Sequence, residues 1–303
     1  MLHLRVIAPP ELTGAVLDLY RHTPGTAHII VHRGAAVQPA GDVIVADVAR
    51  EATDAVIGGL KALGLAEDGA ITLQALDTVL SSAAYRAEDE AEGDGADAVL
   101  WDELLARTRE ESSLTVTFLA FLCIACLLAA VGVVTDSAVT VVGAMVVGPE
   151  FGPLAALAVA VVRRRASLAR RAATALLVGF PLAMVVTAGA TLGFEALGWV
   201  TLTSTRSLKQ VDFIFQVGPF SFVVALLAGA AGMLSLVSAK SAALVGVFIS
   251  VTTVPAAGFA VVAATVGEWD VAAYSAVQLM VNLIGIVAAG VVVLIVHRRL
   301  HRP

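Results

Sequence analysis

The chain has 303 residues, of which 58% are hydrophobic and 15% are charged, and its mean hydropathy is +0.89. This composition excludes an ordinary water-soluble protein and indicates a membrane protein. The charge is unevenly spread, since residues 1–113 hold 19 of the 25 acidic and 8 of the 19 basic residues. We therefore expect a soluble acidic part followed by a membrane part. An acidic surface excludes nucleic acid as a partner, because phosphate contacts require basic side chains.

The first 85 residues are predicted to form a small α+β domain. Strands are expected at 2–8, 28–32, 43–48 and 71–76, and helices at 10–20 and 51–63. This β-α-β-β-α-β order is typical of a ferredoxin-like sandwich. The fold specifies no ligand, so a small-molecule ligand and assembly into a homo-oligomer both stay open. No apolar signal precedes the domain, so we expect it to be cytoplasmic.

A connecting segment is predicted at residues 86–113. Its first part, 88–97 (EDEAEGDGAD), is acidic and contains two glycines, which is typical of a linker. The part after it has apolar residues at helical spacing beside charged ones, which predicts an amphipathic helix. That helix either packs on the soluble domain or lies on the lipid bilayer.

Residues 114–303 are predicted to form an α-helical polytopic membrane bundle. Six apolar stretches reach the length of about 20 residues that a membrane-crossing helix needs. They are 114–134, 137–162, 172–194, 217–237, 241–266 and 273–296. Most basic residues follow the second, fourth and sixth stretches, which places both termini in the cytoplasm by the positive-inside rule.

The second stretch contains the strongest candidate site, Gly148-Pro149-Glu150-Phe151-Gly152-Pro153. Two prolines and two glycines so close together predict an interrupted helix, and exposed backbone at membrane depth persists only in a protein interior or a wet cavity. Glu150 is the only acid inside any of the six stretches, and a carboxylate there is costly unless it is protonated, paired or hydrated. We expect it to bind a small solute, a cation or a proton. The alternative is a kinked helix that Glu150 caps.

The fifth stretch resembles a second copy of this pattern. Ser250, Thr252 and Thr253 precede Pro255, and their hydroxyls either face Glu150 or satisfy backbone groups freed by the proline. Two groups of three spans predict a 3+3 inverted repeat with two interrupted helices, an arrangement typical of secondary transporters. In the sixth stretch Gln278 and Asn282 share one helix face, where they contact either substrate or a neighbouring helix.

A family resemblance rests on the same region. Thr135-Asp136-Ser137, then 142–149 (VGAMVVGP) and Gly152-Pro153, with Glu111-Ser112 upstream, resemble the signature of the prokaryotic domain of unknown function 389, also described as an uncharacterised hydrophobic domain. The resemblance implies a multi-spanning bacterial inner-membrane protein with a cytoplasmic domain. This chain departs from the pattern at Glu150, where the family usually has an apolar residue, so a mechanism based on that charge would belong to a subgroup.

Three functions remain open from the sequence. The first is a secondary transporter of a small polar or ionic solute, the second a membrane-anchored sensor or scaffold, and the third a passive channel. An enzyme is not expected, because no nucleophile–base pair, metal cluster or phosphate loop is visible, and no cofactor is expected either. Cys123 and Cys126 form a CxxC pair at lipid depth, where we expect plain packing residues rather than redox chemistry.

Overall fold

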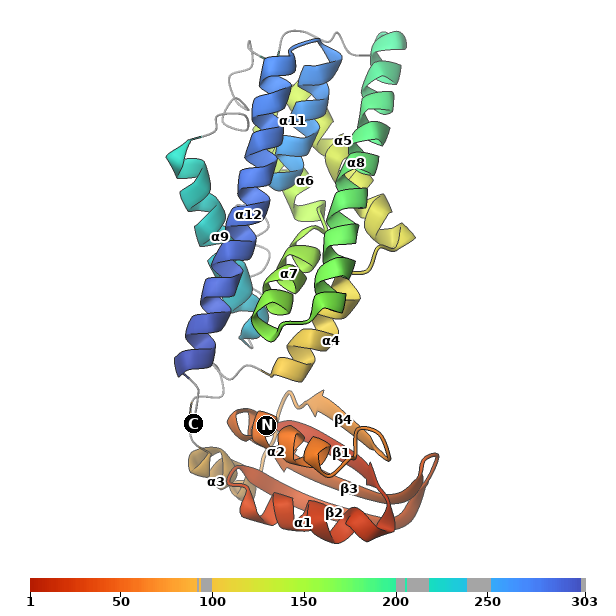
Figure 1. Cartoon of the computed structure of the whole chain (residues 1–303), viewed down its shortest axis with the longest axis vertical. Helices are drawn as coiled ribbons and strands as arrows, with labels where there is room; N and C mark the ends of the chain where they lie inside the picture. Colours follow the sequence, from red (N-terminus) through yellow and green to blue (C-terminus); the bar gives the residue numbers. More distant parts are fainter. Residues whose placement is uncertain (92, 94–99, 200–204, 206–217, 239–251, 301–303) are drawn as a thin grey trace. The chain divides into compact units, whose positions relative to one another are not determined.

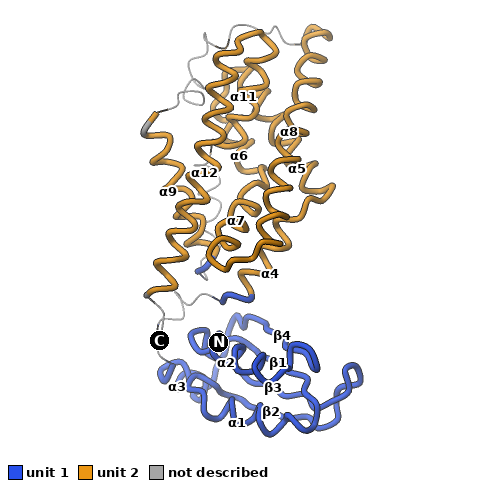
Figure 2. The backbone as a smooth tube through the Cα atoms, in the orientation of Figure 1, with its two compact units in different colours: residues 1–102, 237–239 blue, residues 103–236, 240–303 orange. Residues whose placement is uncertain are grey.

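A computed structural model of the chain describes residues 1–91, 93, 100–199, 205, 218–238 and 252–300. The chain divides into two compact units, shown in different colours in Figure 2. The first comprises residues 1–102 with 237–239, and the second comprises 103–236 with 240–303.

The first unit contains a four-stranded antiparallel sheet (Figure 1). Its strands lie in the order β2-β3-β1-β4. Their bounds are β1 Leu2–Ala8, β2 Thr26–Val37, β3 Ala40–Val48 and β4 Ala70–Ala75, and the helices α1 (Thr13–His22) and α2 (Arg50–Ala62) follow β1 and β3. The element order is therefore the predicted β-α-β-β-α-β.

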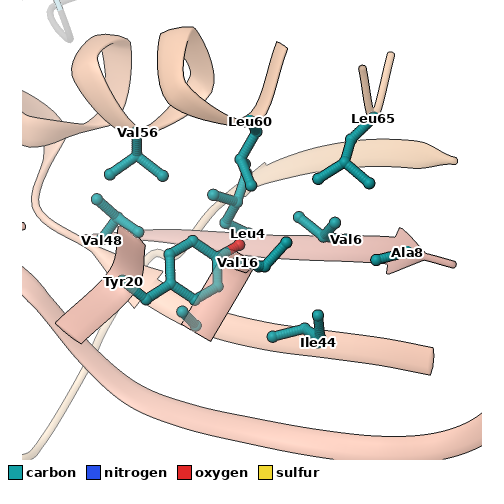
Figure 3. Close-up of a cluster of buried hydrophobic side chains, with 11 residues drawn as sticks. Leu4, Val6, Ala8, Val16, Tyr20, Ile44, Val48, Val56, Leu60 and Leu65 are labelled. Carbon is teal, nitrogen blue, oxygen red and sulfur yellow. The ribbon is translucent and has the colours of Figure 1, made fainter. Parts of the chain in front are cut away.

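The core of this unit lies between the sheet and the two helices. Alternate residues of β1 are buried, as a strand with one covered face requires, and Leu4 and Val6 lie in the core. Tyr20 of α1 and Leu60 of α2 project onto the same cluster (Figure 3). The first helix starts later than expected. Pro10 begins a separate 3-10 turn, and the α-helix begins only at Thr13.

Helix α3 (Ser82–Glu90) was not predicted, since the sequence interpretation ended the domain at residue 85. Ser81 caps it by accepting hydrogen bonds from the amides of Ala83 and Ala84. The helix includes the first residues of the acidic run 88–97, and most of the rest of that run lies outside the described residues. The predicted amphipathic helix is α4 (Trp101–Glu111), which buries Leu104 and Thr108.

The second unit is helical. After α4, the helices that the described residues form in this unit are α5 Val116–Val134, α6 Ala138–Val147, α7 Phe151–Arg163, α8 Ala166–Ala196, α9 Pro219–Val237, α11 Thr253–Thr265 and α12 Trp269–Leu300. Among the described residues, α5, α8, α9 and α12 are long and apolar enough to cross a membrane, and α6 with α7 makes a fifth candidate that is bent by 51°. Six spans were predicted. Helix α11 is apolar but has only 13 residues, and 239–251, before it, lie outside the described residues.

Helix lengths recur along this unit. Helices α5 and α9 each have 19 residues, α7 and α11 each have 13, and α8 and α12 have 31 and 32. The packing recurs as well, because α7 contacts both α8 and α12, and α11 contacts both α12 and α8 (Figure 1).

Glycine permits the close approach of α11 to α5. A Cβ atom on Gly258 would lie 2.7 Å from the Cβ of Ala129, inside van der Waals contact. Small residues let helix backbones approach closely where no hydrophobic effect drives them together. Helix α11 contacts α5, α8 and α12 and is buried along most of its length.

Candidate functional site

The predicted interruption of the second apolar stretch is present. Helix α6 ends at Val147, Gly148 is extended (φ −62°, ψ 128°), and α7 begins at Phe151. Pro149 has no amide hydrogen to continue α6. Pro153 lies in the first turn of α7, where a missing amide costs no helical hydrogen bond. The chain thus stops one helix and starts another within four residues.

Glu150 occupies the N-cap position of α7 and is only 4% exposed. Its side chain does not cap α7, so the capping role considered from the sequence is absent. Instead, its Oε1 atom accepts a hydrogen bond from the hydroxyl of Thr253. Its other oxygen, Oε2, is buried without a hydrogen-bond partner among the described residues. That oxygen lies against Gly148, where a Cβ atom would overlap it.

The start of α11 repeats the start of α7. Thr252 is its N-cap, Thr253 its first residue, and Pro255 stands three residues after the cap, as Pro153 does after Glu150. The amide of Leu154 donates to the carbonyl of Glu150 at 3.2 Å, and that of Ala256 donates to the carbonyl of Thr252 at 3.1 Å. Two helix N-termini of the same construction therefore meet through Glu150 and Thr253.

Helix α12 adds amide groups to this cluster. The Nδ2 atom of Asn282 donates to Oγ1 of Thr252 at 2.8 Å, and Nε2 of Gln278 donates to Oδ1 of Asn282 at 3.2 Å. Both amide side chains are buried. Oε1 of Gln278 and the hydroxyl of Ser275 lack partners in the part of the chain that the structure describes. The interior of the unit thus keeps several polar groups that are not fully paired.

The structure brings together five of the predicted site residues: Glu150, Thr252, Thr253, Gln278 and Asn282. Of the other predicted residues, Gly148 touches the Glu150 carboxyl group and Pro149 is half-buried. Phe151 and Pro153 are buried in the first turn of α7, and Gly152 packs against Glu111. Ser250 lies outside the described residues.

Ser275 was missed in the sequence analysis. Its signal was the spacing 275, 278 and 282, which puts three polar residues on one face of an otherwise apolar helix.

The electrostatics of the site are set by one carboxyl group and two helix ends. No basic side chain pairs with Glu150 in the described ranges. Helix N-termini carry partial positive charge, so α7 and α11 favour a negative group at this position. No group of three or more His, Cys, Asp or Glu suited to a metal occurs among the described residues. Both cysteines are free thiols in α5.

Arginines gather elsewhere in the second unit. A groove of about 590 Å³ is lined by Arg163, Arg164, Arg165 and Arg298. A cavity of about 340 Å³ shares Arg165 and adds Arg109 and Arg171. The end of α7, the start of α8 and the end of α12 therefore form one basic region.

Comparison with known proteins adds a family match. Residues 145–288 match the model of a family described as Domain of unknown function (DUF389). This range begins before the interruption at Gly148 and includes all five of the polar residues that meet at the site. Neither a curated protein nor a solved structure matches the chain.

Proposed function

The chain belongs to the DUF389 family, and from that premise we propose that it is a secondary transporter of a small polar or ionic solute. One observation carries the proposal. The buried carboxyl group of Glu150 lies where the N-termini of α7 and α11 meet, and its Oε2 atom has no hydrogen-bond partner among the described residues. Interrupted helices whose ends point at a common site are the usual construction of substrate and ion sites in such carriers.

The unpaired atoms define the class of solute. Oε2 of Glu150 and Oε1 of Gln278 are both hydrogen-bond acceptors. A buried acceptor without a donor costs free energy, so a ligand that supplies N–H or O–H donors, or a positive charge, would be stabilised here. We therefore propose an amine, a polar solute rich in donors, or a cation as substrate. Glu150 is proposed to take part in coupling by gaining and losing a proton or a cation.

The proposed architecture is six spans in a 3+3 inverted repeat. The recurring helix lengths support it. The packing supports it as well, because α7 and α11 each contact both α8 and α12. In this arrangement α5 to α8 form one repeat, and α9 to α12 form the other. An odd number of spans in each repeat gives the repeats opposite orientations, and rocking of one against the other gives alternating access.

The first unit is proposed to be a ferredoxin-like cytoplasmic domain that binds a small regulatory ligand or mediates homo-oligomer assembly. The strand order β2-β3-β1-β4 with two helices supports this fold. The basic region supports a cytoplasmic location for the end of α7, the start of α8 and the end of α12. We propose a bacterial plasma-membrane protein with both termini in the cytoplasm.

The test is transport by purified protein in proteoliposomes. Solute-evoked currents would be recorded on a solid-supported membrane with a panel of small amines, amino acids and monovalent cations. We expect a current with at least one solute, its loss in Glu150→Gln, and its retention in Glu195→Gln, which alters an exposed carboxyl group of α8. Folded protein that gives no current under any gradient would support the sensor or scaffold function instead. A current that persists in Glu150→Gln would favour a channel.

A further inference from the structure

Three side chains of the first unit form a continuous hydrogen-bonded chain: Ser81, His28 and Asp47. Nε2 of His28 lies 2.8 Å from Oγ of Ser81, and Nδ1 of His28 lies 2.7 Å from Oδ2 of Asp47. The Asp47 side chain is mostly buried, whereas that of His28 is one-third exposed (33%). Ser81 is half-buried. Solvent can therefore reach these hydrogen-bonded side chains at the Ser81 end.

The hydrogen positions follow from the chemistry of the groups. An ionised carboxylate only accepts hydrogen bonds, so neutral His28 must donate its Nδ1 hydrogen to Asp47. Nε2 then carries the lone pair, and the hydroxyl of Ser81 must donate to it. His3 reinforces this order, because its Nδ1 lies 2.7 Å from the other oxygen of Asp47. The imidazole of His28 is thus held in the tautomer that accepts a proton from Ser81.

The backbone at His28 is unusual. Its φ angle is 50°, in the left-handed region that non-glycine residues seldom occupy, and the register of β2 against β3 shifts between Ala27 and Ile30. Bulges of this kind redirect a side chain, and left-handed non-glycine residues cluster at functional sites. The strand departs from regular pairing at the residue that joins Asp47 to Ser81.

Ser81 also stands at the start of α3, a helix of nine residues. The amides of Ala83 and Ala84 donate to its Oγ at 3.2 and 3.5 Å. These hydrogen bonds hold Oγ at the N-terminus of α3. The partial positive charge of a helix N-terminus favours the negative charge that Oγ gains as its proton leaves.

We propose that Ser81 is the nucleophile of an esterase site, with His28 as general base and Asp47 as the positioning residue. The Ser81 hydroxyl gives its proton to Nε2 of His28 while Oγ bonds to the carbonyl carbon of a carboxylic ester. The His28 imidazolium returns that proton to the departing alkoxide, which leaves as an alcohol. Water then attacks the acyl group, its proton passing through Nε2 back to Ser81 Oγ, and a carboxylic acid is released.

This inference is independent of transport, because all the residues it uses belong to the first unit. No enzyme was expected from the sequence, because no nucleophile–base pair is visible in it. His28 and Ser81 are 53 positions apart, and Asp47 stands between them on another strand. Only folding brings them together.

The experiment is covalent labelling of the full-length protein in detergent with a fluorophosphonate probe. Such a probe loses fluoride when an activated serine oxygen bonds to its phosphorus. We expect one adduct, located at Ser81 by peptide mass spectrometry, and hydrolysis of 4-nitrophenyl acetate by the unlabelled protein. Ser81→Asn keeps an N-cap residue for α3 and should abolish both. Ser82→Ala removes the neighbouring exposed hydroxyl and should change neither.

Variants of the two partners separate catalysis from structure. Asn tolerates the left-handed conformation, so His28→Asn removes the base without adding backbone strain, and labelling should slow by about a hundredfold or more. Asp47→Asn should slow it by about tenfold or more, and Asp47→Glu, which restores a carboxylate, should recover part of the rate. The proposal is overturned if folded protein gives no adduct at Ser81, or if His28→Asn labels as fast as the wild type.

Discussion

The hydroxyl of Thr253 donates a hydrogen bond to the carboxyl group of Glu150 across 103 positions of sequence. It joins the first residue of α11 to the N-cap of α7, so the two matching helix starts share one polar contact. Thr253 satisfies only one of the two carboxyl oxygens, and Oε2 stays unpaired among the described residues. A ligand or proton that binds Oε2 would therefore act on a group already connected to both helices.

Gly148 is expected to be essential for the position of this carboxyl group. In Gly148→Ala the new Cβ would overlap Oε2 of Glu150 and lie 2.8 Å from Cγ2 of Val254, so the carboxyl group or α11 must move. We predict a loss of solute-evoked current of tenfold or more, because small displacements of reacting or binding groups have large effects. The measurement is the proteoliposome assay, with the amount of reconstituted protein held equal.

Gly143→Ala provides the matched control for this prediction. Gly143 lies in α6, is exposed, and has no atom within 4 Å of the position of a new Cβ. Alanine should also favour the helix slightly at this position. Equal activity of the two alanine variants would contradict the role given to Gly148.

The interrupted helix could be predicted because its cause is local. Gly148 and Pro149 both disfavour a helix through their own backbone chemistry, and a single acid inside an apolar stretch is visible without a structure. The contact of Glu150 with Thr253, in contrast, depends on how α7 and α11 pack, which no spacing within either helix determines. The hydrogen bond from Asn282 to Thr252 is non-local in the same way.

The strands of the first unit were predictable from alternation, as in β1, where Leu2, Leu4 and Val6 are buried. Helix α3 was missed because its residues are mostly polar and its stability depends on the Ser81 cap and on packing against β2. The hydrogen-bonded group of Ser81, His28 and Asp47 was also missed, because it too depends on contacts between distant residues. The bulge that redirects the His28 side chain arises from the pairing of β2 with β3 rather than from a sequence motif.

Tyr20 offers a stability prediction for the first unit. Its ring is buried in the core (Figure 3). Its hydroxyl oxygen has no hydrogen-bond partner among the described residues. The same burial raises the pKa of the hydroxyl, because the charged form would lose its hydration. A buried unpaired hydroxyl destabilises the fold, so Tyr20→Phe should raise the unfolding free energy of this unit by about 1 kcal/mol.

This change can be measured by hydrogen–deuterium exchange of the amides in β1 and β3 of the full-length protein, which should slow in Tyr20→Phe. Tyr85→Phe is the matched control, because Tyr85 is 52% exposed and its change should leave exchange unaltered. Faster exchange in Tyr20→Phe would mean that the hydroxyl has a stabilising partner.

Asp42 should make the stability of the first unit depend on acid pH. The amide of Gly34 and the hydroxyl of Thr13 donate to its carboxylate at 2.7 and 2.8 Å, and with the nearby Arg33 they hold its pKa below the usual aspartate value against the opposing effect of burial. Because the folded pKa is the lower one, the unfolded chain binds this proton more readily. The contribution is therefore complete above the ordinary aspartate pKa of about 3.9 and is lost as pH falls through the folded value.

Asp42→Asn should remove this acid dependence, because an amide does not titrate. The expected result is a fall in the unfolding free energy of the wild type between about pH 5 and about pH 2 that is smaller in Asp42→Asn. Exchange of the β1 and β3 amides, followed at each pH and corrected for intrinsic rates, measures it, and Asp68→Asn serves as the control because Asp68 is exposed. If Asp42→Asn and the wild type lose the same stability over this range, the hydrogen bonds from Gly34 and Thr13 do not favour the ionised carboxylate.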